Sequence, residues 1–177
     1  MAEELYTWVP FYTELANKLL PYKNDRAALI DKLQAMYESI DTKLPKLDDG
    51  GVPNDIDPFT IFGLFNKGIS SQNRRKIVAA LADVFCITAE LPNDFAGTPL
   101  LNNLNATFYA FIGDSRRGES DIDNLWDLFE AELALADADN PENRNAFAAA
   151  FDKTVGQFGL GWKLTMGLYW ARPLAFI

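Results

Sequence analysis

Cationic side chains gather in one stretch of the chain that carries no acid. Residues 61–80 hold four Lys and Arg side chains and no Asp or Glu. Ammonium and guanidinium groups neutralise nucleic-acid phosphates, and neighbouring amides can donate to and accept from bases or phosphates. The residues predicted to contact a nucleic acid are Asn66, Lys67, Asn73, Arg74, Arg75, Lys76 and Arg172.

The charge of the whole chain opposes this prediction. The 177 residues carry a net charge of −9, and residues 89–177 hold far more acidic than basic groups. A protein with this balance repels DNA at long range, which slows association. A solvated helix face therefore stays open as the alternative interpretation of the basic stretch.

Several catalytic chemistries are excluded by residue type. The chain has no His and a single Cys, so it cannot build a Ser-His-Asp site, a His-ligated zinc site or an internal disulfide. Cys86 lies between apolar neighbours, which predicts a buried and inert thiol. We expect no catalytic residues and no cofactor in this chain.

Two motifs resemble ligand sites but favour structural roles. The glycine-rich segment 156–165 has Trp162 where a phosphate-binding loop needs Lys, so it predicts a turn between helices. Asp123, Asp127 and Glu130 share one helix face, with Asp121 and Glu132 nearby. Carboxylates from one helix rarely converge on a metal ion, so a solvated face is predicted.

Apolar spacing predicts an all-α fold of about seven helices, with at most a short β element near 106–112. That segment could be a strand or a buried helical turn. We expect a single domain over 1–177, with a possible subdivision at the loop near 45–57. Side chains expected to be buried are Trp8, Leu15, Leu33, Phe62, Phe65, Leu81, Phe85, Trp126, Phe129, Phe151 and Leu168.

Polar and proline residues predict where helices begin and end. Pro21 ends the first helix and Asn24 caps the second, which a short loop turns into an antiparallel partner of the first. Asp57 with Pro58 begins a short buried helix that ends at a left-handed Gly68. The starts expected further along are Ser70 or Ser71, Ser120 or Asp121, and Asn140 with Pro141.

The chain ends give a prediction about location. The acidic N-terminus does not read as a signal peptide, and no apolar run is long enough for a membrane span. We therefore expect a soluble, cytoplasmic domain without a membrane partner. Because the sequence stops at the apolar Phe176 and Ile177, we expect a fragment of a longer protein.

Distinctive strings along the chain resemble one bacterial family. They are WVPFY at 8–12, IDPFTIFGLFNKG at 56–68, DFAGTPLLN at 94–102, NLWDLF at 124–129 and WKLTMGLYWARP at 162–173. These strings are similar to the N-terminal region of McrB-like AAA+ proteins. Such proteins are the nucleotide-hydrolysing subunits of 5-methylcytosine-specific restriction systems, which act in phage defence.

The resemblance implies a module that recognises modified double-stranded DNA. It also implies an AAA+ motor in the same polypeptide, hydrolysing GTP or ATP, and a nuclease subunit as a partner. The motor is outside this chain, which has no phosphate-binding loop. Recognition of a flipped base would need an aromatic pocket, for which Trp162, Tyr169 and Trp170 are candidates, although such residues also suit a core.

A second interpretation is an acidic helical module that docks on its own motor or on a partner subunit without touching nucleic acid. The position of the basic residues separates the two. Convergence of Lys67, Arg74, Arg75 and Arg172 on one face favours DNA, whereas scattering or pairing with acids favours docking. An enzyme that uses carboxylates alone is a weaker third interpretation, because no pair of them is evident.

Overall fold

A computed structural model describes residues 6–102 and 106–175, and within these ranges the fold is all-α. Seven α-helices and one 3-10 helix form in the described part, which has two isolated β-bridges and no longer strand. No helix there is long and apolar enough to cross a membrane. The helices are α1 (Val9–Leu19), η1 (Leu20–Asn24), α2 (Arg26–Ser39), α3 (Pro58–Gly63), α4 (Ser71–Phe85), α5 (Asp121–Asp137), α6 (Pro141–Thr154) and α7 (Lys163–Ala171).

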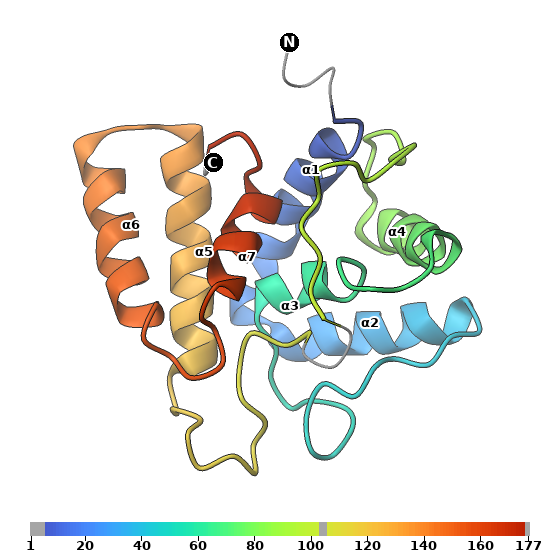
Figure 1. Ribbon diagram of the computed structural model, residues 1–177, viewed down its shortest axis with the longest axis horizontal. Coiled ribbons are helices and arrows are strands. Elements are labelled where there is room, and N and C mark those ends of the chain that lie inside the picture. Colours follow the sequence, from blue (N-terminus) through green and yellow to red (C-terminus); the bar gives the residue numbers. More distant parts are fainter. Residues whose placement is uncertain (1–5, 103–105, 176–177) are drawn as a thin grey trace.

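The short helix α3 lies at the centre of the molecule, with the longer helices around it (Figure 1). All six of its residues are buried, as its uniformly apolar sequence predicts. The ring of Phe59 lies 5.6 Å from Phe108 and 5.5 Å from Phe129, measured between centroids. Helix α3 therefore joins α5 and the 106–112 segment into one core.

Asp57 begins α3 as predicted. Its Oδ1 accepts hydrogen bonds from the backbone of Phe59 and Thr60, at 2.8 and 3.0 Å, and Oδ2 accepts from the Thr60 hydroxyl. Pro58 occupies the first turn, where no N–H is needed. Burial of the carboxyl raises the pKa of Asp57 to about 6, although these hydrogen bonds oppose the shift.

The predicted end of α3 at a left-handed Gly68 is wrong. The helix ends at Gly63, and its cap residue Leu64 keeps a right-handed conformation. The backbone N–H of Asn66 still donates to the Phe62 carbonyl, so one further turn follows the helix without a left-handed residue. Gly63 is needed for space, because a Cβ there would lie 2.6 Å from the Ala106 carbonyl oxygen.

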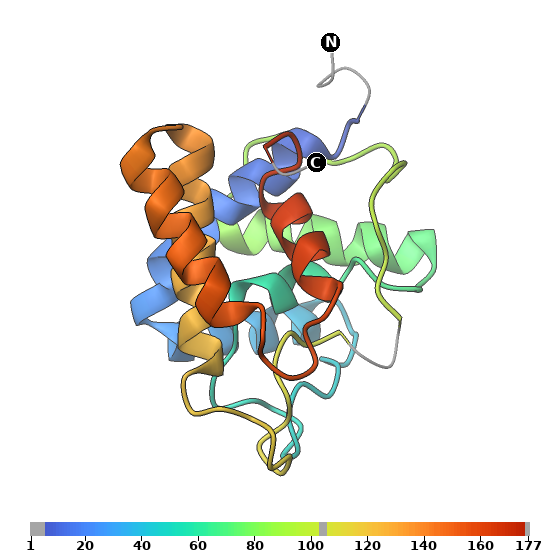
Figure 2. The ribbon, with the colours of Figure 1, turned by 60° about the vertical axis from the view of Figure 1, so that its left-hand side comes forward.

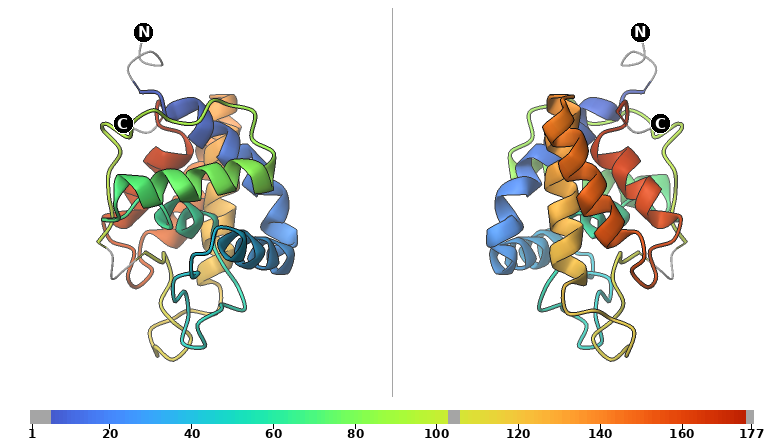
Figure 3. Two further views of the ribbon diagram at one scale, coloured as in Figure 1. Left: turned by 90° about the vertical axis from the view of Figure 1, so that its right-hand side faces the viewer. Right: turned by 90° about the vertical axis from the view of Figure 1, so that its left-hand side faces the viewer.

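The first two helices differ from the prediction in their connection. The α-helix ends at Leu19, just before Pro21, as predicted, but the chain continues as the 3-10 helix η1 in place of a loop, and Asp25 rather than Asn24 caps α2. Proline fits there because the first turn of a helix needs no N–H. Helix α2 runs across the end of α1 and packs against α4 (Figures 1 and 3). The predicted antiparallel pair is therefore wrong.

Helix α6 lies on the outside of the molecule, where it packs against α5 (Figure 2). Its only buried side chain in the described structure is Thr154, and Phe151 is half-buried. The prediction that Phe151 is buried is therefore wrong, because α6 has a neighbour on one side only. The other ten side chains expected in the core are buried.

Two further segments depart from the predictions. Residues 106–112 form neither strand nor helical turn, and Phe108 and Tyr109 are buried in irregular backbone. Cys86 is exposed rather than buried. It caps α4 with φ 52°, and this left-handed residue turns the chain away from the helix. The apolar sequence around Cys86 did not predict that reversal.

Candidate functional site

Three of the seven predicted contact residues are buried where α3 leads into α4, namely Asn66, Lys67 and Arg74. The guanidinium of Arg74 donates to the carbonyl oxygens of Phe65 and Lys67, at 2.8 and 3.1 Å. Asn66 is fully buried, and its Oδ1 accepts a 2.7 Å hydrogen bond from the Tyr12 hydroxyl. These contacts hold the connection between the two helices, so the side chains of Asn66 and Arg74 serve the fold.

Arg172 is buried in a different environment, at the end of α7. Its guanidinium donates to Asn17 Oδ1 at 2.6 Å and to the Ala171 carbonyl at 2.9 Å. It also lies 3.5 Å from a carboxylate oxygen of Asp137. Arg172 therefore pairs with an acid, and in the described structure its hydrogen-bond and ion-pair partners differ from those of Arg74.

The three aromatic residues considered for a base pocket lie in different surroundings. Trp170 is fully buried and its indole donates to the Pro99 carbonyl at 3.2 Å, and Tyr169 packs on Trp8. Trp162 is 63% exposed. An enclosed base pocket needs rings that face one another, and these three rings have no contact with one another among the described contacts.

Three predicted contact residues are exposed at the start of α4: Asn73, Arg75 and Lys76. Ser70 caps this helix, as predicted, by accepting from the backbone N–H of Asn73. Arg75 donates to the Asn93 carbonyl at 2.7 Å, and Lys76 Nζ lies 3.3 Å from the Thr42 hydroxyl. The first turn of α4 therefore contacts both flanking loops with its cationic ends at the surface.

A small cavity lies beside this turn, and three of the predicted residues line it, namely Lys67, Asn73 and Lys76. We call it the lysine cavity, and its volume is about 120 Å³. Its lining contains three lysines and no acid. The lining residues are Tyr37, Thr42, Lys43, Pro45, Leu64, Lys67, Ile69, Asn73, Lys76 and Ile77. The sequence did not single out Tyr37 or Lys43, since neither lies near α4 along the chain.

Burial perturbs two groups that line the lysine cavity. Lys67 is only 8% exposed, and loss of solvent lowers the pKa of its ammonium. The Tyr37 hydroxyl is buried without a hydrogen-bond partner in the described structure, and burial raises its pKa. A buried polar group without a partner is destabilising. The cavity wall therefore keeps unsatisfied hydrogen-bonding capacity.

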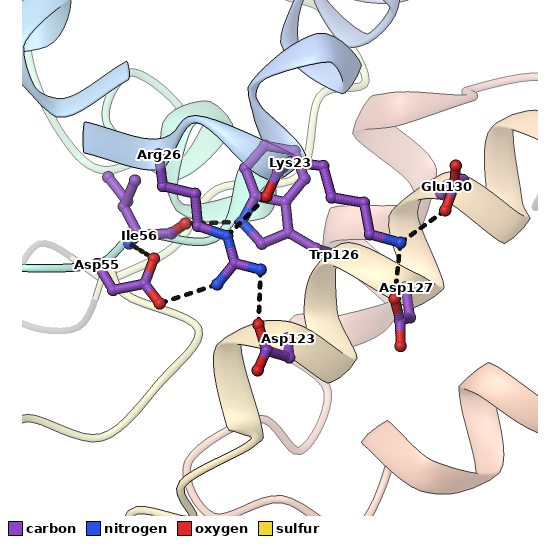
Figure 4. Close-up of polar contacts among 8 residues, drawn as sticks. All are labelled: Lys23, Arg26, Asp55, Ile56, Asp123, Trp126, Asp127 and Glu130. Atoms are coloured by element: carbon purple, nitrogen blue, oxygen red, sulfur yellow. Dashed lines mark hydrogen bonds and ion pairs between the residues drawn. The ribbon is translucent and has the colours of Figure 1, made fainter. Parts of the chain in front are cut away.

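Asp123, Asp127 and Glu130 are exposed on α5, as predicted, and each also forms an ion pair (Figure 4). The neighbouring Asp121 and Glu132 are buried instead, which corrects the prediction for these two. Lys23 Nζ lies 2.7 Å from Asp127 and 2.6 Å from Glu130. Arg26 binds Asp123 at 2.6 Å and also reaches Asp55. Within the described residues no group of three or more metal-ligating side chains is placed to hold a metal ion.

The glycine-rich segment forms the predicted turn. Residues 155–162, which we call the α6–α7 turn, join the last two helices. Gly159 and Gly161 adopt positive φ angles of 84° and 45°. The turn exposes apolar side chains, and the Arg116 guanidinium lies 3.6 Å from the centroid of the Phe158 ring.

Comparison with known proteins identifies a family. The domain of unknown function DUF8425 matches residues 8–177. The chain belongs to this family. No curated protein and no solved structure matches the chain. DUF8425 carries no assigned activity, so functional argument rests on the geometry above.

Proposed function

We propose that this DUF8425 domain is a docking module that binds a protein surface through the α6–α7 turn. The observation that carries the proposal is Trp162, which is 63% exposed in a turn that also exposes Val155 and Phe158. Large exposed aromatic side chains are the residues that most often dominate binding energy at protein interfaces. Neighbouring apolar groups on one turn strengthen this support.

The charge distribution supports docking over DNA contact. Arg74 and Arg172 are buried and Arg172 pairs with Asp137, which is the scattered arrangement expected of a docking module. The net charge of −9 favours a partner with a cationic surface. The resemblance of the chain to the N-terminal region of McrB-like proteins suggests that this partner is the AAA+ motor of the same restriction system.

The test compares Trp162→Ala with Leu91→Ala, which truncates another exposed apolar side chain, 49% exposed, outside the turn. Binding to the purified AAA+ motor is measured by calorimetry. We expect Trp162→Ala to weaken binding by about 2 kcal/mol or more, and Leu91→Ala to leave it unchanged. Equal binding by both variants would show that the turn is not the interface.

DNA contact is the second candidate function, and the acid-free lysine cavity favours it. Lys67, Asn73 and Lys76 line this cavity, and Arg75 is exposed next to Lys76 at the start of α4. Fluorescence anisotropy with methylated and unmethylated duplexes tests it between about 50 mM and about 200 mM salt. Affinity that falls steeply with salt, and that Arg75→Glu removes, would replace docking by DNA contact as the function.

A further inference from the structure

We propose that the lysine cavity binds a phosphate group. The cavity lies between the loop that follows α2 and the first turn of α4, and its volume is about 120 Å³. This space is too small for most drug-sized ligands, whose pockets begin near 300 Å³. It suits a single compact anionic group with the rest of its molecule outside.

The charge of the lining selects an anion. Lys43, Lys67 and Lys76 line the cavity, and none of the other lining residues is acidic. In a chain with net charge −9, three ammonium groups around one acid-free cavity form an unusual local concentration of positive charge. An anion in the cavity would relieve the repulsion among them.

Two of the lining groups are buried in a way that favours a bound anion. Lys67 is 8% exposed, and burial lowers the pKa of its ammonium, which an anion in the cavity would oppose. The hydroxyl of Tyr37 has no hydrogen-bond partner within the described part of the chain, and Tyr37 is 1% exposed. Because buried polar groups in folded proteins are nearly always hydrogen-bonded, the Tyr37 hydroxyl indicates an absent partner.

The type of cation indicates phosphate rather than carboxylate. Arginine holds a planar carboxylate through two parallel hydrogen bonds, and no arginine lines this cavity. Lysine presents a compact charge with three donors that rotate to suit a tetrahedral group. Asn73 also lines the cavity, and its amide can donate to a phosphate oxygen.

A free phosphorylated compound and a nucleic-acid phosphate share this chemistry. The site does not depend on the docking function, because the α6–α7 turn contributes no residue to the cavity lining. If Trp162→Ala does not weaken binding to the motor, the phosphate proposal is unaffected. If phosphate does not bind, the docking proposal is unaffected.

Calorimetric titration with inorganic phosphate tests the proposal, with ribose 5-phosphate, acetate and a short DNA duplex as parallel titrants. We expect binding of inorganic phosphate, and weaker or no binding of acetate. Lys76→Met, at an exposed position that tolerates substitution, should weaken phosphate binding about tenfold, since a hydrogen bond to a charged group is lost. Lys67→Met should act in the same direction.

Lys32→Met is the matched control, because Lys32 is exposed on α2 and lines none of the cavities described here. It should leave the affinity unchanged. If the duplex competes with inorganic phosphate, the cavity binds a nucleic-acid phosphate. If ribose 5-phosphate binds and the duplex does not compete, the cavity binds a small phosphorylated compound. Absence of phosphate binding at millimolar concentration, or equal affinity of Lys76→Met and Lys32→Met, would overturn the proposal.

Discussion

Glu132 is an acidic side chain buried in the core. It is fully buried on α5, and neither carboxylate oxygen has a hydrogen-bond partner in the described structure. Arg172 is the charge that acts on it most favourably, yet burial raises the pKa of Glu132 well above 4.5. The folded protein therefore holds a proton on this carboxyl that the unfolded chain releases at lower pH.

Glu132→Gln should stabilise the protein at neutral pH. Because the folded-state pKa lies above the unfolded value of 4.5, the wild type is most stable below that value and loses stability as pH rises. Glutamine does not ionise, so the gain should be about 1 to 3 kcal/mol at pH 7 and vanish near pH 4. Urea unfolding at both pH values measures it.

A variant less stable than wild type at pH 7 would mean that the Glu132 charge contributes favourably through Arg172. The spacing of Glu132 from Leu125 and Leu128 does place it on the core face of α5. Residue type argued for the solvated face instead, because an acid is rarely buried without a partner. The prediction grouped Glu132 with the solvated acidic residues by its type, and the helical spacing that places it in the core was not used.

Helix α7 meets the core at a glycine that leaves no room for a side chain. A Cβ at Gly167 would lie 2.7 Å from Phe59 Cδ1 and 2.9 Å from Phe108 Cε1. Both rings are fully buried, so neither can move away without disturbing its neighbours. The close approach of α7 to α3 therefore depends on Gly167.

Gly167→Ala should destabilise the protein by about 1 to 3 kcal/mol, because the added methyl group overpacks the core. The expected loss is opposite to the usual effect of this substitution, because alanine is favoured over glycine inside a helix by about 1 kcal/mol. The matched control is Gly156→Ala, where a Cβ would meet nothing within 4 Å. Thermal unfolding of both variants decides the point, and a stabilised Gly167→Ala would refute the tight packing.

The starts of helices were more predictable than their ends and directions. Asp57, Ser70 and Asn140 each cap a helix by accepting from a backbone N–H two or three residues away. Such contacts are local, so the sequence displays them. The crossing of α2 over α1 depends on packing against α4, which lies more than thirty residues further along. Local signals carry no information about that choice.

The molecule is joined across its sequence by the paired charges shown in Figure 4. Arg26 at the start of α2 reaches Asp123 on α5 and lies 5.8 Å from the centroid of the Trp126 ring. The indole of Trp126 in turn donates to the Ile56 carbonyl at 2.8 Å. One arginine thus bridges the N-terminal helices, the central loop and the C-terminal half.

Arg26→Met should lower the free energy of unfolding by about 1 kcal/mol or more, since it removes two ion pairs and a contact with an indole ring. A double-mutant cycle with Asp123→Asn isolates their coupling, expected at about 0.5 kcal/mol because Asp123 is 62% exposed. Chemical denaturation at low and high salt measures both quantities. Additive effects at low salt would show that the pair is not coupled.

The candidate site could be predicted only in part from the sequence. The basic stretch at the start of α4 supplied Lys67, Asn73 and Lys76, because their charge and clustering are visible along the chain. Lys43 and Tyr37 come from α2 and its following loop, and they reach the cavity only through folding. The sequence also did not predict the burial of Arg74, because its guanidinium donates to backbone carbonyls, which every residue has.

The reversal of the chain after α4 provides a natural point of attachment. Cys86 is the sole cysteine and its side chain is exposed, so a thiol-reactive dye would modify the protein at one position without any engineered residue. The residue lines neither the lysine cavity nor the α6–α7 turn. A single label there can therefore be used to test the proposed docking and the proposed phosphate binding in the unaltered sequence.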